Sequence, residues 1–169
     1  MSAENSIKIP RKSFVVSAFL VSSVIFGVGH AAAGPFSSFP GAWSGTGTIE
    51  LSDGRKERMR CQATYRARGA EDRTVDLQLG CASDSYKFQL TGDLVSQGEQ
   101  ISGQWSETTR NIGGSAIGRI RGERMQLHVE TGGFAANLSL QTKGKSQSVN
   151  IDSQGGGERI KANITLRRN

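Results

Sequence analysis

Residues 159–167 read RIKANITLR, and this stretch decides the fold. Its apolar residues alternate strictly with polar ones: Ile160, Ala162, Ile164 and Leu166. Successive side chains of a β-strand point to opposite faces of a sheet, so the stretch has one apolar and one polar face. Residues 58–67 and 74–82 repeat the alternation. The pattern is typical of antiparallel sheets that cover a core on one face only.

Short strands account for most of residues 43–169, and turn pairs such as Asp53-Gly54 and Gly122-Glu123 separate them. We expect strands at residues 43–51, 58–67, 74–82, 86–94, 101–108, 115–120, 124–130, 134–142, 147–152 and 159–167. No stretch shows helical periodicity. The sequence therefore predicts an all-β, antiparallel up-and-down barrel of about eight to ten strands, because closure removes exposed strand edges.

The N-terminus is predicted to be a signal-peptide helix, residues 1–33. A basic segment with Lys8, Arg11 and Lys12 precedes the uncharged apolar run 13–28, and three alanines follow it up to Ala33. This order favours cleavage before Gly34. An uncleaved anchor is the alternative, but a spanning helix needs about 20 apolar residues. We expect a periplasmic or secreted protein that does not span the membrane after cleavage.

The remaining chain divides into a lead-in segment, residues 34–42, and the barrel domain, residues 43–169. The lead-in is expected to lie across one barrel end. An outer-membrane barrel with its apolar face toward lipid is the alternative placement. The expected strands are mostly shorter than the roughly 9–11 residues of a spanning strand, and arginines crowd the polar face, which favours a solvated exterior.

Gly41-Ala42-Trp43, at the start of the first strand, resembles the Gly-x-Trp opening of the lipocalins and their wider calycin group. The resemblance implies a barrel whose tryptophan plugs the closed end. In that family an arginine after an aromatic pair near the C-terminus packs over the tryptophan. No such aromatic pair precedes an arginine here, so no arginine is expected over Trp43.

Cys61 and Cys81 are the two cysteines of the chain. Both fall on the inward phase of their strands. A hairpin centred on residue 71 places them directly opposite each other, within about 4.5–5.5 Å between Cβ atoms. In an oxidising compartment this predicts a disulfide, with two buried free thiols as the alternative.

Catalytic chemistry is not expected. Nucleophilic catalysis needs an oriented base, and the one histidine of the barrel domain, His128, faces outward. We expect no Asp or Glu on the inward phase, so no buried acid is predicted. We therefore expect no enzyme, no metal site and no cofactor. With a formal charge of +6, an anionic partner is favoured, although nucleic acid is a poor partner for an exported protein.

Two surfaces remain as candidate sites. The first is an anion-binding face on the second and last strands: Arg55, Lys56, Arg58, Arg60, Arg66, Arg159, Lys161 and Arg167. The second is the interior, whose apolar lining includes the aromatic residues Trp43, Tyr65, Tyr86, Phe88, Trp105 and Phe134. No inward cation is expected, so the interior is either a filled core or a cavity for an uncharged apolar ligand.

These observations favour an exported, non-enzymatic binding module. Its ligand is a small apolar molecule inside the barrel or an anionic envelope component on the basic face. The alternative is a structural or inhibitory module that contacts another protein through the barrel rim or the basic face.

Overall fold

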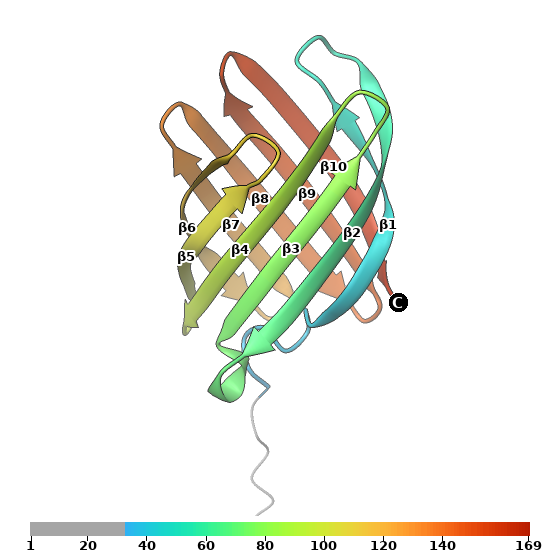
Figure 1. Ribbon diagram of the computed structural model, residues 1–169. Coiled ribbons are helices and arrows are strands. Elements are labelled where there is room, and N and C mark those ends of the chain that lie inside the picture. Colours follow the sequence, from blue (N-terminus) through green and yellow to red (C-terminus); the bar gives the residue numbers. More distant parts are fainter. Residues whose placement is uncertain (1–32) are drawn as a thin grey trace, which may run out of the picture. The chain divides into compact units, whose positions relative to one another are not determined.

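Ten antiparallel strands follow one another around a closed barrel in a computed structural model that describes residues 33–169 (Figure 1). The strands are β1 (Gly41–Glu50), β2 (Lys56–Arg68), β3 (Thr74–Ala82), β4 (Lys87–Gln97), β5 (Gln100–Glu107), β6 (Ile112–Arg121), β7 (Arg124–Thr131), β8 (Phe134–Lys143), β9 (Ser146–Gly155) and β10 (Glu158–Arg168). A single 3₁₀ turn (Ala70–Asp72) joins β2 to β3. Each strand pairs with the next, and β10 pairs with β1, so the predicted up-and-down barrel is confirmed.

The predicted signal peptide lies outside the described residues, apart from its last residue, and stays a prediction. Within residues 33–169, no helix is long and apolar enough to cross a membrane.

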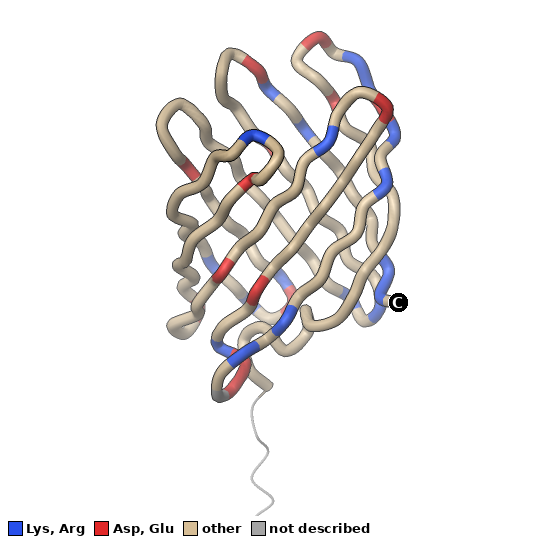
Figure 2. The backbone as a smooth tube through the Cα atoms, viewed as in Figure 1, with Lys and Arg blue, Asp and Glu red and all other residues tan. Residues whose placement is uncertain are grey.

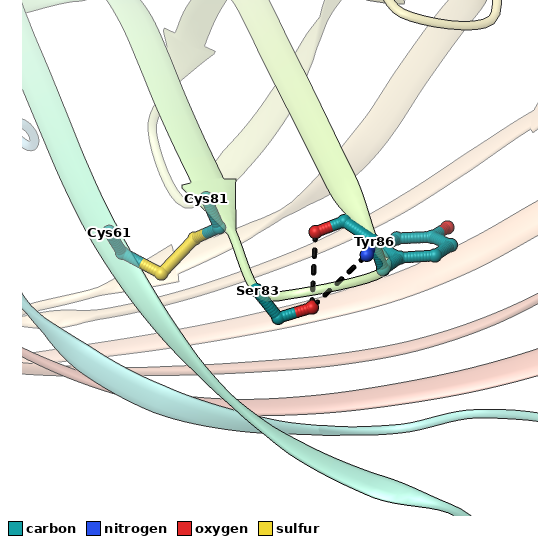
Figure 3. The surroundings of a disulfide bond; sticks show 4 residues. All are labelled: Cys61, Cys81, Ser83 and Tyr86. Carbon is teal, nitrogen blue, oxygen red and sulfur yellow. Dashed lines mark hydrogen bonds between the residues drawn. A yellow bond between two sulfur atoms is a disulfide. The ribbon is translucent and has the colours of Figure 1, made fainter.

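The predicted register of the β2–β3 hairpin is confirmed. Cys61 lies opposite Cys81, and Tyr65 lies opposite Leu77. The two cysteines form the predicted disulfide, close to the turn that contains Ser83 and Tyr86 (Figure 3). The bridge is buried and links two neighbouring strands near one end of the barrel.

The alternating apolar residues line the barrel interior. The inward residues of β10 are a clear case, because Ala162, Ile164 and Leu166 are at most 2 % exposed while their polar neighbours are exposed. Burial of such side chains stabilises the fold by about 1.5–3 kcal/mol for each large one. The interior is therefore a core over much of its length.

The lead-in segment closes one barrel end. The side chains of Phe36 and Phe39 are fully buried there. The Phe39 ring lies 5.8 Å from the ring of Tyr65, and the Phe39 carbonyl accepts a 3.0 Å hydrogen bond from the indole of Trp43. We call this the closed end. The opposite end, where β3 turns into β4 and β5 into β6, is the open end (Figure 1).

Gly45 shows how tightly the strands approach each other. A Cβ atom at this inward position of β1 would lie 2.0 Å from the carbonyl oxygen of Thr165 on β10. Glycine is required here because the backbone of β10 leaves no room for a side chain at this position of β1. Gly45 thus allows β1 to pair with β10, and this pairing closes the barrel.

Candidate functional site

The open end of the barrel holds an apolar cavity of about 70 Å³. Its deeper wall consists of aliphatic side chains and small residues: Leu77, Gly92, Leu94, Ala116, Leu127 and Leu138. Its rim carries larger and polar side chains: Tyr86, Glu107, Arg110, Ile112, Phe134 and Ile160. One water needs about 10–15 Å³, so this space takes roughly five waters or the narrow part of a small molecule.

The aromatic residues predicted for the interior divide between the two ends. Trp43 and Tyr65 are buried in the plug at the closed end, where the Tyr65 hydroxyl donates a 2.7 Å hydrogen bond to Gln147 Oε1. The others line the cavity at the open end: Tyr86, Phe88, Trp105 and Phe134. The ring centroids of Trp105 and Phe134 lie 5.5 Å apart, so these two rings form one side of the cavity.

Glu107 corrects the prediction that no acidic residue faces inward. It is 4 % exposed and lines the cavity at the end of β5. Its carboxylate accepts hydrogen bonds from the backbone N–H groups of Gln89, Thr109 and Arg110, at 2.8, 3.0 and 2.9 Å. The residue shares the phase of Ile101 and Trp105, so the strand alternation itself carried this signal.

The ionised form of Glu107 is favoured. Burial raises the pKa of this carboxyl, but the hydrogen bonds from the Gln89 and Thr109 backbone, from the Thr109 hydroxyl and from Arg110 outweigh it, and the pKa lies below its usual range. Glu107 therefore organises the β5–β6 turn as a carboxylate.

Arg110 corrects the expectation that no cation faces the interior. It comes from the β5–β6 turn, where strand periodicity predicts nothing, and it lies on the cavity rim. Its Nη1 donates to the Glu107 carboxylate at 3.2 Å, and its Cζ lies 4.5 Å from the centre of the Tyr86 ring. Burial raises the pKa of the Tyr86 phenol, and the charge of Arg110 counteracts part of that rise. Ion pair and ring together hold the guanidinium at the mouth of the cavity.

Trp105, which lines the cavity, also carries a buried polar group. The residue is 8 % exposed, and its indole N–H has no hydrogen-bond partner among the described residues. A buried donor without a partner costs about 1–3 kcal/mol.

The basic face splits into paired and unpaired cations. Three of the predicted residues form ion pairs: Arg55 with Asp53, Lys56 with Glu50 and Arg159 with Asp152. Five form none within residues 33–169: Arg58, Arg60, Arg66, Lys161 and Arg167. They lie on β2 and β10, the two neighbours of β1, and Figure 2 shows the basic positions spread along these strands.

No family model and no curated protein matches the chain. Several solved structures are similar to it, including the following two. The S-type phycobiliprotein lyase CPES from Guillardia theta matches with a TM-score of 0.59 and 10% identity, over 79% of this chain and 90% of that one. Rv2717c from M. tuberculosis matches with a TM-score of 0.62 and 14% identity, over 79% of this chain and 94% of that one. Both structures share the barrel fold of this chain. At these identities the likeness shows the fold alone.

The comparison corrects the expectation that the protein is not an enzyme. A barrel of the same fold is named a lyase. The fold is therefore compatible with enzymatic activity, and an outward histidine does not exclude it.

Proposed function

We propose that the protein binds a small molecule whose apolar part occupies the cavity at the open end. The observation that carries this proposal is the asymmetry of the barrel. Phe36 and Phe39 fill the closed end, whereas the open end keeps an apolar space with polar groups at its rim. Concave apolar sites with a few fixed polar groups are the usual form of small-molecule sites.

The size of the cavity limits the ligand. Drug-sized ligands usually occupy roughly 300–1,000 Å³, well above the 70 Å³ found here. A slender aliphatic chain enters such a space more readily than a large ring system. A bulkier ligand requires movement of the half-buried rim side chains Phe134 and Ile160.

Calorimetric titration with 1-hexanol tests the proposal, with two alanines of β8 as a matched pair. Ala136 lines the cavity, whereas its neighbour Ala135 lies on the outer face. We expect saturable binding of one 1-hexanol, about tenfold weaker binding to Ala136→Val, and unchanged binding to Ala135→Val. Absence of saturable binding to the wild-type protein, or equal binding to both variants, refutes the cavity as the site.

A second candidate function is the binding of an anionic envelope polymer to the unpaired cations of the basic face. Arginine binds carboxylate and phosphate oxygens with two parallel hydrogen bonds. In the described chain, no acidic side chain forms an ion pair with Arg58, Arg60 or Arg66. Such binding weakens as salt rises, because screening acts over about 8 Å at physiological ionic strength.

Binding to alginate, a carboxylated polymer, tests this second function. We expect the triple variant R58Q/R60Q/R66Q to lose binding. The control variant R55Q/R121Q/R159Q removes the same charge from ion-paired arginines and should retain most of it. If both variants lose alginate binding equally, the binding depends on net charge alone, which contradicts a specific site on the basic face.

We also propose that the protein acts in the periplasm or outside the cell. The Cys61–Cys81 disulfide supports this placement, because such bonds persist in oxidising compartments. N-terminal sequencing of protein from the envelope fraction of its host should find Gly34 first, within about a residue. An intact Met1 in that fraction contradicts cleavage.

A further inference from the structure

We infer that the ligand of the open-end cavity carries a carboxylate, which binds Arg110 while its apolar chain enters the barrel. This inference rests on the cavity function proposed above. It names the ligand class as a short-chain aliphatic carboxylic acid in its ionised form.

The position of Arg110 is the first argument. Its guanidinium lies on the rim of the cavity, and its side chain remains 37% exposed. A molecule with its chain against the deeper wall therefore has its head group at this rim. The cavity lining offers one other charged side chain, Glu107, whose oxygens are already engaged.

The free hydrogen-bonding capacity of Arg110 is the second argument. Its side-chain hydrogen bonds all leave from Nη1, to Glu107, to the Thr109 hydroxyl and to the Lys87 carbonyl. Nε and Nη2 remain for a ligand. Two neighbouring N–H donors on a planar guanidinium match the two oxygens of a carboxylate.

The fixed geometry of the rim is the third argument. Three backbone N–H groups hold Glu107, Glu107 holds Arg110 Nη1, and the Tyr86 ring supports the guanidinium from one face. The arginine is thus ordered before the ligand arrives. Preorganised donors lose less conformational entropy on binding than flexible surface lysines or arginines do.

The choice of carboxylate over other head groups follows from charge. Glu107 contacts the guanidinium of Arg110 at Nη1 alone, at 3.2 Å, so Nε and Nη2 have no acidic partner among the described residues. An ammonium head group would meet the guanidinium with like charge. A hydroxyl can accept hydrogen bonds from the guanidinium, but it carries no charge and offers one oxygen instead of two, so it forms neither an ion pair nor the two-oxygen contact of a carboxylate.

Titration of hexanoate and 1-hexanol into the same proteins tests the inference, because the two ligands share a six-carbon chain and differ in the head group. We expect hexanoate to bind the wild-type protein about tenfold more tightly than 1-hexanol. In Arg110→Gln the advantage of hexanoate should disappear while 1-hexanol binding is kept. Retained 1-hexanol binding also shows that this variant is folded.

Arg121→Gln is the matched control. Arg121 pairs with Glu99 at 2.7 Å and is the last residue of β6, at the closed end of the barrel. Its loss should leave the preference for hexanoate unchanged. Equal binding of the two ligands to the wild-type protein, or a preference that survives Arg110→Gln, overturns the carboxylate inference but leaves the cavity function standing. If neither ligand binds, both proposals fall.

Discussion

The guanidinium of Arg168 packs over the indole of Trp43, with its Cζ 4.6 Å from the ring centre. Its Nη2 also donates a 2.6 Å hydrogen bond to the carbonyl of Ser38 in the lead-in segment. The last strand thereby fastens the first strand and the lead-in at the closed end. This contact corrects the expectation that no arginine covers Trp43.

Replacement of Arg168 by glutamine should destabilise the protein. The contact with the indole ring and the hydrogen bond to Ser38 together account for about 1–3 kcal/mol of unfolding free energy. Urea unfolding at neutral pH measures the difference. Arg167→Gln, at the exposed neighbouring position, is the control and should change stability by less than about 0.5 kcal/mol. Equal effects of the two substitutions would show that the closed end does not depend on Arg168.

Reduction of the Cys61–Cys81 disulfide should lower the melting temperature. The two cysteines are 20 residues apart in sequence, and closure of a loop of this size stabilises a fold by roughly 3 kcal/mol in the chain-entropy estimate. Melting curves with and without dithiothreitol measure the effect, and the double variant C61A/C81A should not respond to the reductant. Free thiols in protein purified from its own host without reductant would contradict the bridge.

Two glycines of the barrel wall should respond oppositely to alanine. Gly45→Ala brings a methyl group onto the Thr165 carbonyl and should destabilise the barrel by several kcal/mol. Gly80→Ala finds its nearest atoms at 3.8 Å and lies in a β-strand, so it should be neutral or slightly stabilising. Urea midpoints of the two variants test the pair, and a tolerated Gly45→Ala would disprove the close approach of β1 and β10.

Glu107 should make stability depend on acidic pH. Its pKa in the folded protein lies below the ordinary value of 4.5, so its contribution is fully present above that value. The contribution disappears as the pH falls through the folded-state pKa, because the unfolded chain then binds more protons. The difference in unfolding free energy between the wild-type protein and Glu107→Gln should therefore shrink from pH 7 to pH 3. A difference independent of pH would mean that Glu107 is not held as a carboxylate.

The sequence predicted the barrel and the β2–β3 register because both depend on strict alternation. Once Met59, Cys61 and Ala63 face the core, a shift of one residue would turn them all toward water. The disulfide followed from the same register.

The site was predicted only in part. Arg110 lies in a turn, where no periodicity reports the direction of a side chain. Glu107 lies within the expected strand 101–108 and shares the inward phase of Ile101 and Trp105, so for this residue the alternation pattern does indicate the inward direction. The cover of Trp43 by Arg168 depends on the pairing of β1 with β10, in which these two residues lie opposite each other, and local sequence does not encode the register of strands so far apart.

The most direct test of the cavity function is an NMR titration of ¹⁵N-labelled protein with 1-hexanol, read at the two indole N–H resonances. Trp105 lines the open-end cavity, whereas Trp43 lies in the closed-end plug, where its N–H is bound to the Phe39 carbonyl. The account predicts that the Trp105 resonance shifts saturably and that the Trp43 resonance stays in place. A titration in which the Trp105 resonance does not move, or in which both move without saturation, would contradict it.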